Sequence, residues 1–493
     1  MYRHNSRHGS VRHGAPALLL VAALAIGRIT APGVAQDAAL NTPPAGFTAL
    51  FNGRDLAGWK GLVADPPKRA QMSAQELAAA QEQADARMRE HWRVADGVLV
   101  FDGKGDSLCT ARDYGDFELR VDWKIEAGGD SGIYLRGSPQ VQIWEKPAVG
   151  SGGLYNNQKH PSQPLFVADR PPGEWNTFRI LMSGERVTVY LNGVLVVDDT
   201  PLENYWERGK PICPTGQIEL QNHGGPLWFR DIFIRELPAS RAAQPAAATL
   251  PGGAVESVAA GLLQHGDRVA IVGDSITEQK WYSRFMEDYL VACLPELELR
   301  VAQFGWSGER APGFAARMAN DLLPWRPTVV TTCYGMNDGL YRPYELGIGT
   351  TYADGMRQIV APLLERKGGE AGAAARPVRV VVGAPGAVDT FSFRRPDRVA
   401  PEAYNDNLAH LRDIARELAR EFGQPFANVH DHMVLAMLRA KPALGQEYHV
   451  CGGDGFHPAP NGHLVMAYAF LKALGCDGQI GTITLEWGKP ATA

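Results

Sequence analysis

Three side chains in the second half of the chain have the types and spacing of a nucleophilic centre. Ser275 lies in a Gly-Asp-Ser turn directly after the apolar run of residues 269–272. Asp454 and His457 are three residues apart in a loop that contains glycine and proline. A hydroxyl nucleophile needs a base, and an imidazole next to a carboxylate can supply one. These residues are therefore candidate parts of an acyl-transfer site.

Two further segments offer hydrogen-bond donors for an oxyanion. Gly308 lies in FGWSGER (304–310), where a bare backbone can bring an N–H group close to a substrate oxygen. Asn337 lies in TTCYGMND (331–338) and supplies a side-chain amide at the end of an apolar run. Taken singly, Asn337 could make a turn and Ser275 could cap a helix. The joint occurrence of the segments in this order favours the catalytic interpretation.

The order of these segments resembles that of the SGNH (GDSL-type) hydrolase family. The resemblance implies that Ser275 is the nucleophile, His457 the general base and Asp454 its orienting partner. It also implies an oxyanion hole made by the N–H groups of Ser275 and Gly308 and by the side chain of Asn337. We expect no cofactor and no bound metal.

Strand and helix patterns alternate around these residues. Strands are predicted near residues 269–272, 299–304, 328–333, 378–382 and 426–430. Helices are predicted near residues 281–293, 314–322, 352–365 and 401–422. This alternation indicates a parallel sheet with helices on both faces, and the resemblance implies a three-layer α/β/α, flavodoxin-like fold. Ligands bind at the C-terminal strand ends of such sheets, where Ser275, Gly308 and Asn337 all fall.

A segment with two histidines, VHDHM, follows the last of these strands. His430, Asp431 and His432 could be mistaken for metal ligands. We interpret them instead as residues at the end of that strand that support the site or lie on the surface. Residues 482–487 have the pattern of one more strand.

The first half of the chain has the pattern of an antiparallel β-sandwich. From residue 46 to 237, apolar and polar residues alternate, as in FELRVDWK (117–124). Asp-Gly and Asn-Gly pairs between such runs are typical of hairpin turns. Residues 73–90 interrupt this pattern as a helical insertion, which we expect Ser73 and Glu76 to cap.

Several motifs in this half resemble the 3-keto-disaccharide hydrolase family. Among them are GFTALFNGRDLAGWKG (46–61), GGDSGIYLRG (128–137) and GQIELQNHGGPLWFRDI (216–232). The resemblance implies a concanavalin-like jelly roll that handles glycans. We expect the second half to be a serine esterase that hydrolyses acyl or acetyl esters on glycans. Two possibilities stay open for the first half: a domain that hydrolyses 3-keto-glycosides, even as the main catalyst with the esterase accessory, and a domain that only binds sugar and tethers the esterase to a polysaccharide.

Polar residues within these motifs are the candidates for a sugar cleft: Asp130, Arg136, Gln142, Glu145, Glu219, Gln221 and His223. Glu145 or Glu219 together with His223 could perform acid–base chemistry if they converge. Seven of the eleven tryptophans lie in this half and can stack on sugar rings, although aromatic residues also fill sandwich cores. No ligand spacing supports a metal at His223.

The composition is that of an ordinary folded protein with more than one domain. The chain has 493 residues, of which 21% are charged, and a formal net charge of −5. This length exceeds the usual single core, and the charge offers no basic surface for nucleic acid. An Ala- and Pro-rich stretch at residues 238–260 is predicted to be a linker. The hydrolase domain is then expected at residues 261–476 and a C-terminal tail at 477–493.

Residues 1–35 have the features of a signal peptide, with early arginines, a twelve-residue apolar run and small residues before a cut. We therefore expect an exported protein, periplasmic or secreted, that acts on a carbohydrate or acylated glycan without stable membrane insertion after cleavage. The alternative is an uncleaved anchor. Six cysteines without a C-x-x-C pair fit export but indicate neither a zinc site nor a disulfide pairing. The oligomeric state stays open.

Overall fold

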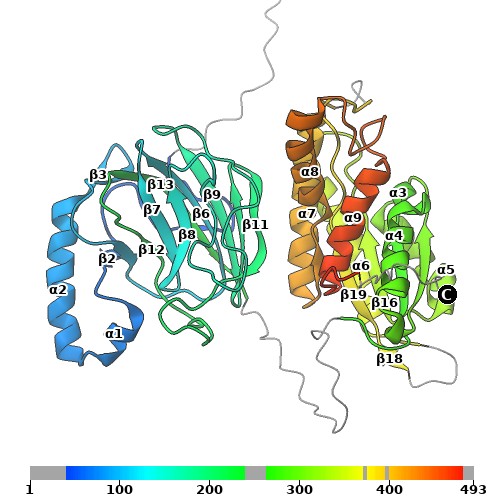
Figure 1. Ribbon diagram of the computed structural model, residues 1–493, viewed down its shortest axis with the longest axis horizontal. Coiled ribbons are helices and arrows are strands. Elements are labelled where there is room, and N and C mark those ends of the chain that lie inside the picture. The colour runs from blue at the N-terminus through cyan, green and yellow to red at the C-terminus, as the bar shows by residue number, and fades with distance from the viewer. Residues whose placement is uncertain (1–39, 239–261, 370–374, 395–398, 481–493) are drawn as a thin grey trace, which may run out of the picture.

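The computed structural model describes residues 40–238, 262–369, 375–394 and 399–480, which form two domains (Figure 1). The N-terminal domain is a β-sandwich, and the C-terminal domain is a parallel sheet covered by helices. The predicted signal peptide, nearly all of the predicted linker and the strand expected at residues 482–487 lie outside the described residues.

The N-terminal domain consists of two antiparallel sheets. Its strands are β1 (Thr48–Ala49), β2 (Trp59–Gly61), β3 (Trp92–Ala95), β4 (Val98–Phe101), β5 (Leu108–Thr110), β6 (Phe117–Ile125), β7 (Asp130–Leu135), β8 (Ser138–Trp144), β9 (Asn176–Ser183), β10 (Arg186–Leu191), β11 (Val194–Pro201), β12 (Glu219–Leu220) and β13 (Leu227–Glu236). The first sheet has the order β11-β10-β9-β6-β13-β4-β3, with β1 paired to β13. The second has the order β2-β5-β12-β7-β8.

Alternation along the strands builds the core between these sheets. In β6, every second side chain from Phe117 to Ile125 is buried in this core, and the side chains between them point to the other face of the first sheet. The period-two pattern of the sequence thus predicts correctly which face of the strand is apolar.

Two helices lie at one end of the sandwich, as Figure 1 shows: α1 (Pro66–Gln71) and α2 (Ala74–His91). The side chains of Ser73 and Glu76 each accept a hydrogen bond from the other's backbone, which makes a capping box at the start of α2. The helical insertion therefore begins at the residue where its capping pair is found.

The C-terminal domain contains a five-stranded parallel sheet of order β15-β14-β16-β19-β20. Its strands are β14 (Arg268–Gly273), β15 (Arg300–Gly305), β16 (Val329–Cys333), β19 (Arg379–Gly383) and β20 (Phe426–Ala427), and a separate pair is formed by β17 (Lys367–Gly368) and β18 (Arg376–Pro377). The helices are α3 (Ser275–Glu278), α4 (Trp281–Ala292), α5 (Ala311–Asp321), α6 (Leu346–Leu364), α7 (Pro401–Glu421), α8 (Val429–Leu444) and α9 (Pro460–Ala473).

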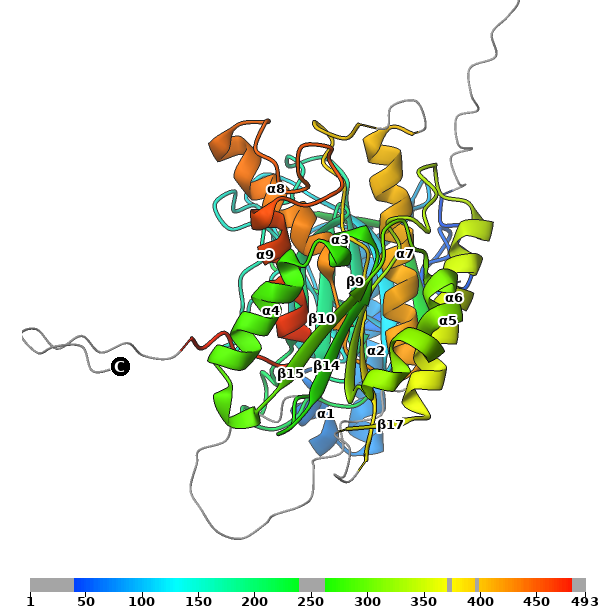
Figure 2. The same ribbon diagram turned by 90° about the vertical axis from the view of Figure 1, so that its right-hand side faces the viewer.

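Neighbouring residues of these parallel strands enter two different cores. Val269 and Ile271 of β14 pack in the core that includes α4 and α9, whereas Ala270 and Val272 pack in the core that includes α5 and α6. Figure 2 shows helices on both sides of strands β14 and β15. The predicted fold classes, a sandwich followed by a three-layer α/β/α domain, are therefore confirmed.

The segment VHDHM does not end a strand, and that part of the sequence analysis is wrong. β20 stops at Ala427, and the segment forms the first turn of α8. Asp431 is favoured there because a carboxylate stabilises a helix N-terminus, and it also accepts a hydrogen bond from the Asn428 side chain at 2.8 Å. His430 is 4% exposed, and His432 lies 3.3 Å from Asp198 of the other domain. These residues belong to the contact between the domains.

A buried cluster of charges joins α7 and α8 to the outer face of the first sheet. Asp431 accepts hydrogen bonds from the Arg412 guanidinium at 2.5 Å and from the hydroxyl of Tyr190, on β10, at 2.7 Å. Arg179 of β9 donates to Asp413 of α7 at 2.9 Å. Burial acts to raise the pKa of Asp431, but the attraction of Arg412, the hydrogen bond and charge of His430 and the attraction of Arg416 together outweigh it, and the pKa lies well below its usual value. Because buried charges need partners, this cluster holds the two domains together.

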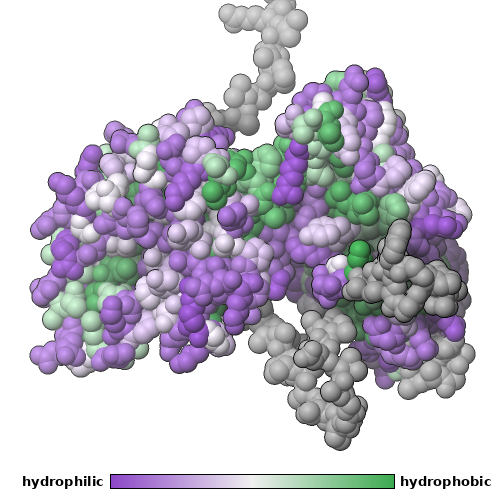
Figure 3. Space-filling model, viewed as in Figure 1, coloured by the Kyte–Doolittle hydropathy of each residue, from purple (hydrophilic) through white to green (hydrophobic). Residues whose placement is uncertain are grey.

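All six cysteines are free thiols. Within the described ranges, no helix is both long and apolar enough to cross a bilayer, and no group of His, Cys, Asp and Glu side chains is arranged to hold a metal ion. The face drawn in Figure 3 is mainly hydrophilic, with hydrophobic residues gathered in small patches.

Candidate active site

Ser275 follows the C-terminal end of β14 and is the first residue of α3. Asp274 caps this short helix and accepts a hydrogen bond from the Ile276 N–H at 3.0 Å. A Cβ atom on Gly273 would lie 2.1 Å from the Thr277 hydroxyl oxygen, so the tight turn needs glycine there. The local sequence therefore turns the chain sharply and presents the serine at the sheet edge.

The fold brings His457 to this serine across 182 residues of sequence. The Ser275 Oγ lies 2.9 Å from His457 Nε2. On the other side of the ring, His457 Nδ1 lies 2.8 Å from Asp454 Oδ2. The second oxygen of Asp454 accepts the backbone N–H of His457 at 2.9 Å, which fixes the carboxylate against its own loop. A hydroxyl, an imidazole and a carboxylate in such a line can pass a proton from the oxygen to the ring.

The carboxylate of Asp454 is suited to stay ionised. Burial acts to raise its pKa, but hydrogen bonds from the backbone and ring of His457 and from the Phe456 N–H outweigh burial and leave the pKa below its usual value. An ionised carboxylate orients the ring and stabilises an imidazolium after proton transfer. The acid in this line is therefore an orienting group and not a proton source near neutral pH.

Asn337 is oriented at the same sheet edge by three neighbours. Its Nδ2 donates to the Glu309 carbonyl oxygen at 3.1 Å and to Asp274 Oδ2 at 3.4 Å. Its Oδ1 accepts from the Tyr341 hydroxyl at 3.3 Å. The amide is thus held at the sheet edge, and donation to an oxyanion requires one of its two Nδ2 hydrogens to leave its present acceptor, the longer contact being that with Asp274.

Gly308 lies in the loop after β15. Its φ of +70° is in the left-handed region that favours glycine, and a Cβ atom there would meet nothing within 4 Å. The Trp306 N–H donates to the Gly273 carbonyl oxygen at 3.1 Å, which ties this loop to the end of β14. Backbone conformation, and not crowding, is therefore the reason for glycine at this position.

Two carboxylates that the sequence analysis did not select support this arrangement. Glu309 accepts both ends of the Arg317 guanidinium, at 2.6 and 2.7 Å, and the Tyr334 hydroxyl at 3.0 Å. Asp274, which contacts Asn337, is buried, and burial raises its pKa to about 7. Asp274 directly precedes Ser275 and Glu309 directly follows Gly308. This adjacency to predicted site residues is the sequence signal from which both could have been predicted.

In the N-terminal domain, three of the predicted sugar-binding residues lie together. Gln142 donates from Nε2 to Asp130 Oδ1 at 2.6 Å, and His223 Nδ1 lies 3.7 Å from Asp130 Oδ2. Gln221 donates instead to the Tyr134 hydroxyl at 3.4 Å. Asp130, at the start of β7, is therefore the centre of a small group of polar side chains.

The other three predicted residues are bound elsewhere. Arg136 is 4% exposed and donates to Asp116 at 2.5 Å, as a buried ion pair. Glu145 accepts the Gly128 N–H at 3.1 Å. Glu219 is 3% exposed, and burial raises its pKa to about 7 against the attraction of Arg69. Among the described residues, Glu145, Glu219 and His223 make no hydrogen bond or ion pair with one another, and their acid–base role stays a prediction.

Comparisons with protein families divide the chain at the same place as the fold. Residues 46–235 match the 3-keto-alpha-glucoside-1,2-lyase-like domain, and residues 271–465 match the GDSL-like lipase/acylhydrolase family. The two matches cover the sandwich and the parallel-sheet domain respectively.

Two curated proteins are similar to one half each. A 3-keto-disaccharide hydrolase from Bacteroides thetaiotaomicron is 22% identical over 249 residues, which is 39% of this chain and 79% of the relative. An acetylxylan esterase from Geobacillus stearothermophilus is 24% identical over 231 residues, which is 43% of this chain and 95% of the relative.

Solved structures are also similar to one half at a time. A glycosyl hydrolase structure from Parabacteroides distasonis is 24% identical, covers 40% of this chain and 100% of its own, and gives a TM-score of 0.31. The structure of the acetylxylan esterase Axe2 from Geobacillus stearothermophilus is 21% identical, covers 43% of this chain and 96% of its own, and gives a TM-score of 0.34. By the two family matches and the two curated relatives, the chain is a fusion of a 3-keto-disaccharide hydrolase-like domain with a GDSL-type hydrolase domain, and it is a hydrolase of ester bonds.

Proposed function

We propose that the C-terminal domain is a serine esterase that removes acetyl or similar acyl groups from glycans. The single observation that carries this proposal is the contact of 2.9 Å between Ser275 Oγ and His457 Nε2, continued to Asp454. The similarity to an acetylxylan esterase supports the choice of an acetyl group and of a glycan as its carrier.

In this reaction, His457 takes the proton of Ser275 while the serine oxygen attacks the ester carbonyl carbon. The negative oxygen of the tetrahedral intermediate is held by the N–H groups of Ser275 and Gly308 and by the amide of Asn337. The sugar alcohol leaves with the proton from His457. A water molecule, deprotonated by the same imidazole, then attacks the acyl-enzyme, and the carboxylic acid is released.

Hydrolysis of acetylated xylo-oligosaccharides and of 4-nitrophenyl acetate by the Ser275→Ala variant tests this function. Without the nucleophile, we expect kcat to fall by a factor of about 10⁴ or more for both esters. Thr350→Ala, at an exposed position on α6, is the control and should keep full activity. Full activity in Ser275→Ala would show that another group performs the reaction.

For the remaining parts of the chain, we propose export through residues 1–35 and binding of the glycan by the N-terminal domain. The resemblance of this domain to a family of glycan-handling proteins supports its role in binding. Mass spectrometry of the mature N-terminus and cell fractionation test export. A protein that keeps residue 1 and stays in the cytoplasm would contradict it.

A second candidate function for the N-terminal domain is turnover of 3-keto-glycosides. The observation in its favour is the Asp130 carboxylate, which accepts a hydrogen bond from Gln142 at 2.6 Å and lies 3.7 Å from the His223 ring. Incubation of the full chain and of Asp130→Asn with a 3-keto-disaccharide tests this function. Turnover that is lost in the variant supports catalysis, and the absence of turnover in the wild type leaves binding as the role of this domain.

A further inference from the structure

A pocket of about 240 Å³ lies at one end of the sandwich, in the domain that does not contain Ser275. Its walls come from the ends of β6 and β8, the start of β9, and the loops at residues 145–147 and 167–174. Three prolines in these loops (Pro147, Pro171 and Pro172) restrict the backbone around the opening. The pocket is therefore built largely from strand ends and stiff loops.

Two tryptophans give this pocket apolar walls. Trp123 is 1% exposed, and its indole N–H has no hydrogen-bond partner among the described residues, although a buried indole N–H is normally paired. Trp144 donates its own N–H to the Gly150 carbonyl oxygen at 2.7 Å, and the Lys146 ammonium lies 3.9 Å from its ring centre. The aromatic rings are thus fixed in place, and one buried polar group is left without a partner in the protein.

Carboxylates and cations surround these rings. Glu145, Asp169 and Glu174 line the pocket together with Lys146 and Arg170. Glu174 is exposed, so its oxygens are accessible to a ligand. Carboxylate oxygens accept hydrogen bonds from hydroxyl groups, and the excess of acidic over basic side chains disfavours an anionic ligand. A cavity lined by two largely buried rings, which are 1% and 8% exposed, and by hydrogen-bond acceptors matches a neutral sugar, which has apolar C–H groups and hydroxyl edges.

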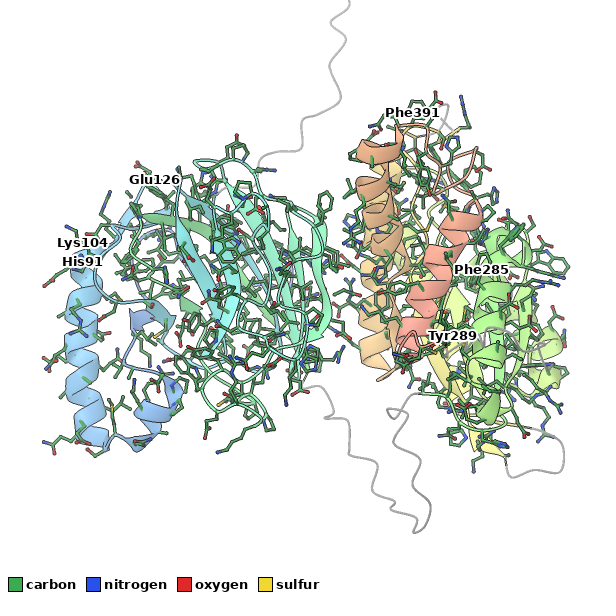
Figure 4. All side chains as sticks on the ribbon, in the orientation of Figure 1. His91, Lys104, Glu126, Phe285, Tyr289 and Phe391 are labelled. Atoms are coloured by element: carbon green, nitrogen blue, oxygen red, sulfur yellow. The ribbon has the colours of Figure 1, made fainter. Side chains whose placement is uncertain are left out.

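A residue next to the pocket and a residue near the Ser275 site can both be located in Figure 4. In Figure 4, Glu126, which follows β6 next to the pocket, lies at the upper end of the N-terminal domain. Phe391 lies at the upper end of the C-terminal domain, on the loop whose Arg394 N–H donates to the Asp454 carbonyl oxygen at 3.1 Å. The contact of Tyr190 with Asp431 holds the two domains in this relation.

We propose that this pocket binds a sugar ring of the neutral glycan whose esters the C-terminal domain hydrolyses. This inference rests on the proposed esterase function and names the place where its substrate chain is held. The pocket contributes affinity for the glycan, whereas acyl transfer takes place only at Ser275.

Isothermal titration calorimetry on the full chain tests the pocket, with xylohexaose, cellohexaose, laminarihexaose and maltohexaose as probes. We expect the wild type and Ser275→Ala to bind at least one of them equally well. Val167→Arg places a long side chain in the pocket from a position that is 40% exposed, and we expect it to weaken binding tenfold or more. Glu174→Ala removes one acceptor and should weaken binding several-fold.

Glu126→Arg is the matched control, because this exposed position is not part of the pocket lining. It should bind as the wild type does. No binding of any probe by the wild type, or equal binding by Val167→Arg and the wild type, would overturn the proposal.

Kinetics separate this proposal from the esterase function. Val167→Arg should raise KM for acetylated oligosaccharides about tenfold with kcat unchanged, and should hydrolyse 4-nitrophenyl acetate normally. If Ser275→Ala loses activity but KM of Val167→Arg is unchanged, the pocket is not a substrate site and the esterase function stands. If Ser275→Ala keeps its activity, the esterase function itself is wrong.

Discussion

The two domains of this chain arrange their polar side chains in different ways. In the C-terminal domain, Ser275, His457 and Asp454 form one continuous line of contacts of 2.8 to 2.9 Å. In the N-terminal domain, Arg136 is used in a buried ion pair and Glu219 is buried beside Arg69. The site residues predicted for the C-terminal domain, from motifs in a fixed order, contact one another. Those predicted for the N-terminal domain, mainly from their chemical type, contact several different partners.

The architecture of each domain explains this difference. Parallel strands all end at the same edge of a sheet, so residues that follow different strands are brought together there. In an antiparallel sandwich, neighbouring strands run in opposite directions, and polar residues spread over a face and both ends. A position directly after a strand therefore predicts that side chains meet in the parallel sheet, but it does not predict this in the antiparallel sandwich.

The largest expected effect concerns His457, the proposed base in the Ser275–His457–Asp454 series of contacts. His457→Ala should lower kcat for 4-nitrophenyl acetate by a factor of about 10⁴ or more, because no group is left to accept the serine proton. His223→Ala, in the N-terminal domain, is the control and should leave this activity unchanged. Steady-state kinetics measure kcat for both variants. Equal kcat values for His457→Ala and His223→Ala would contradict the prediction.

The next effect concerns the cluster that joins the two domains. Asp431→Ala removes one of the two carboxylates that Arg412 and Arg416 contact, since Asp413 remains, and should destabilise the chain by about 3 kcal/mol. Urea unfolding measures this loss. Glu417→Ala, which removes a half-exposed partner of Arg235, should cost at most about 1 kcal/mol. Equal losses in the two variants would mean that burial does not set the strength of these contacts.

A third effect concerns the oriented amide of the C-terminal domain. Asn337→Ala removes a donor from the expected oxyanion position and should lower kcat by a factor of about 10²–10³. Tyr341→Phe removes only one contact to Asn337 and should have a smaller effect. Rates of acetyl ester hydrolysis give both values. An Asn337→Ala variant as active as the wild type would remove the amide from the mechanism.

The smallest expected effect concerns Glu219, whose pKa is raised by burial to about 7 from 4.5. The folded chain holds this proton more tightly than the unfolded chain, so the contribution to stability is present below about pH 4.5 and is lost as the pH rises through 7. Glu219→Gln should remove this loss, which is at most about 3 kcal/mol. Urea unfolding at pH 5 and pH 8 measures it. An unchanged pH dependence in the variant would place Glu219 in water and return it to the sugar cleft.

Short stretches of the sequence were enough to predict the local features of the fold. Apolar alternation from Phe117 to Ile125 specifies a strand with one buried face, and Ser73 with Glu76 specifies where α2 begins. The Gly-Asp-Ser turn specifies that Ser275 follows a strand. These features depend on residues close in sequence, and for that reason they can be predicted without the fold.

Contacts between residues far apart in the sequence could be identified only in the folded chain. The sequence pattern of VHDHM predicted the end of a strand, but Asp431 lies in the first turn of α8 and accepts a hydrogen bond from Tyr190 of the other domain. In the same way, nothing near Arg136 in the sequence indicates Asp116 as its partner across the sandwich. A buried charge is placed by whatever opposite charge the packing of two surfaces brings to it, and that packing involves the whole chain.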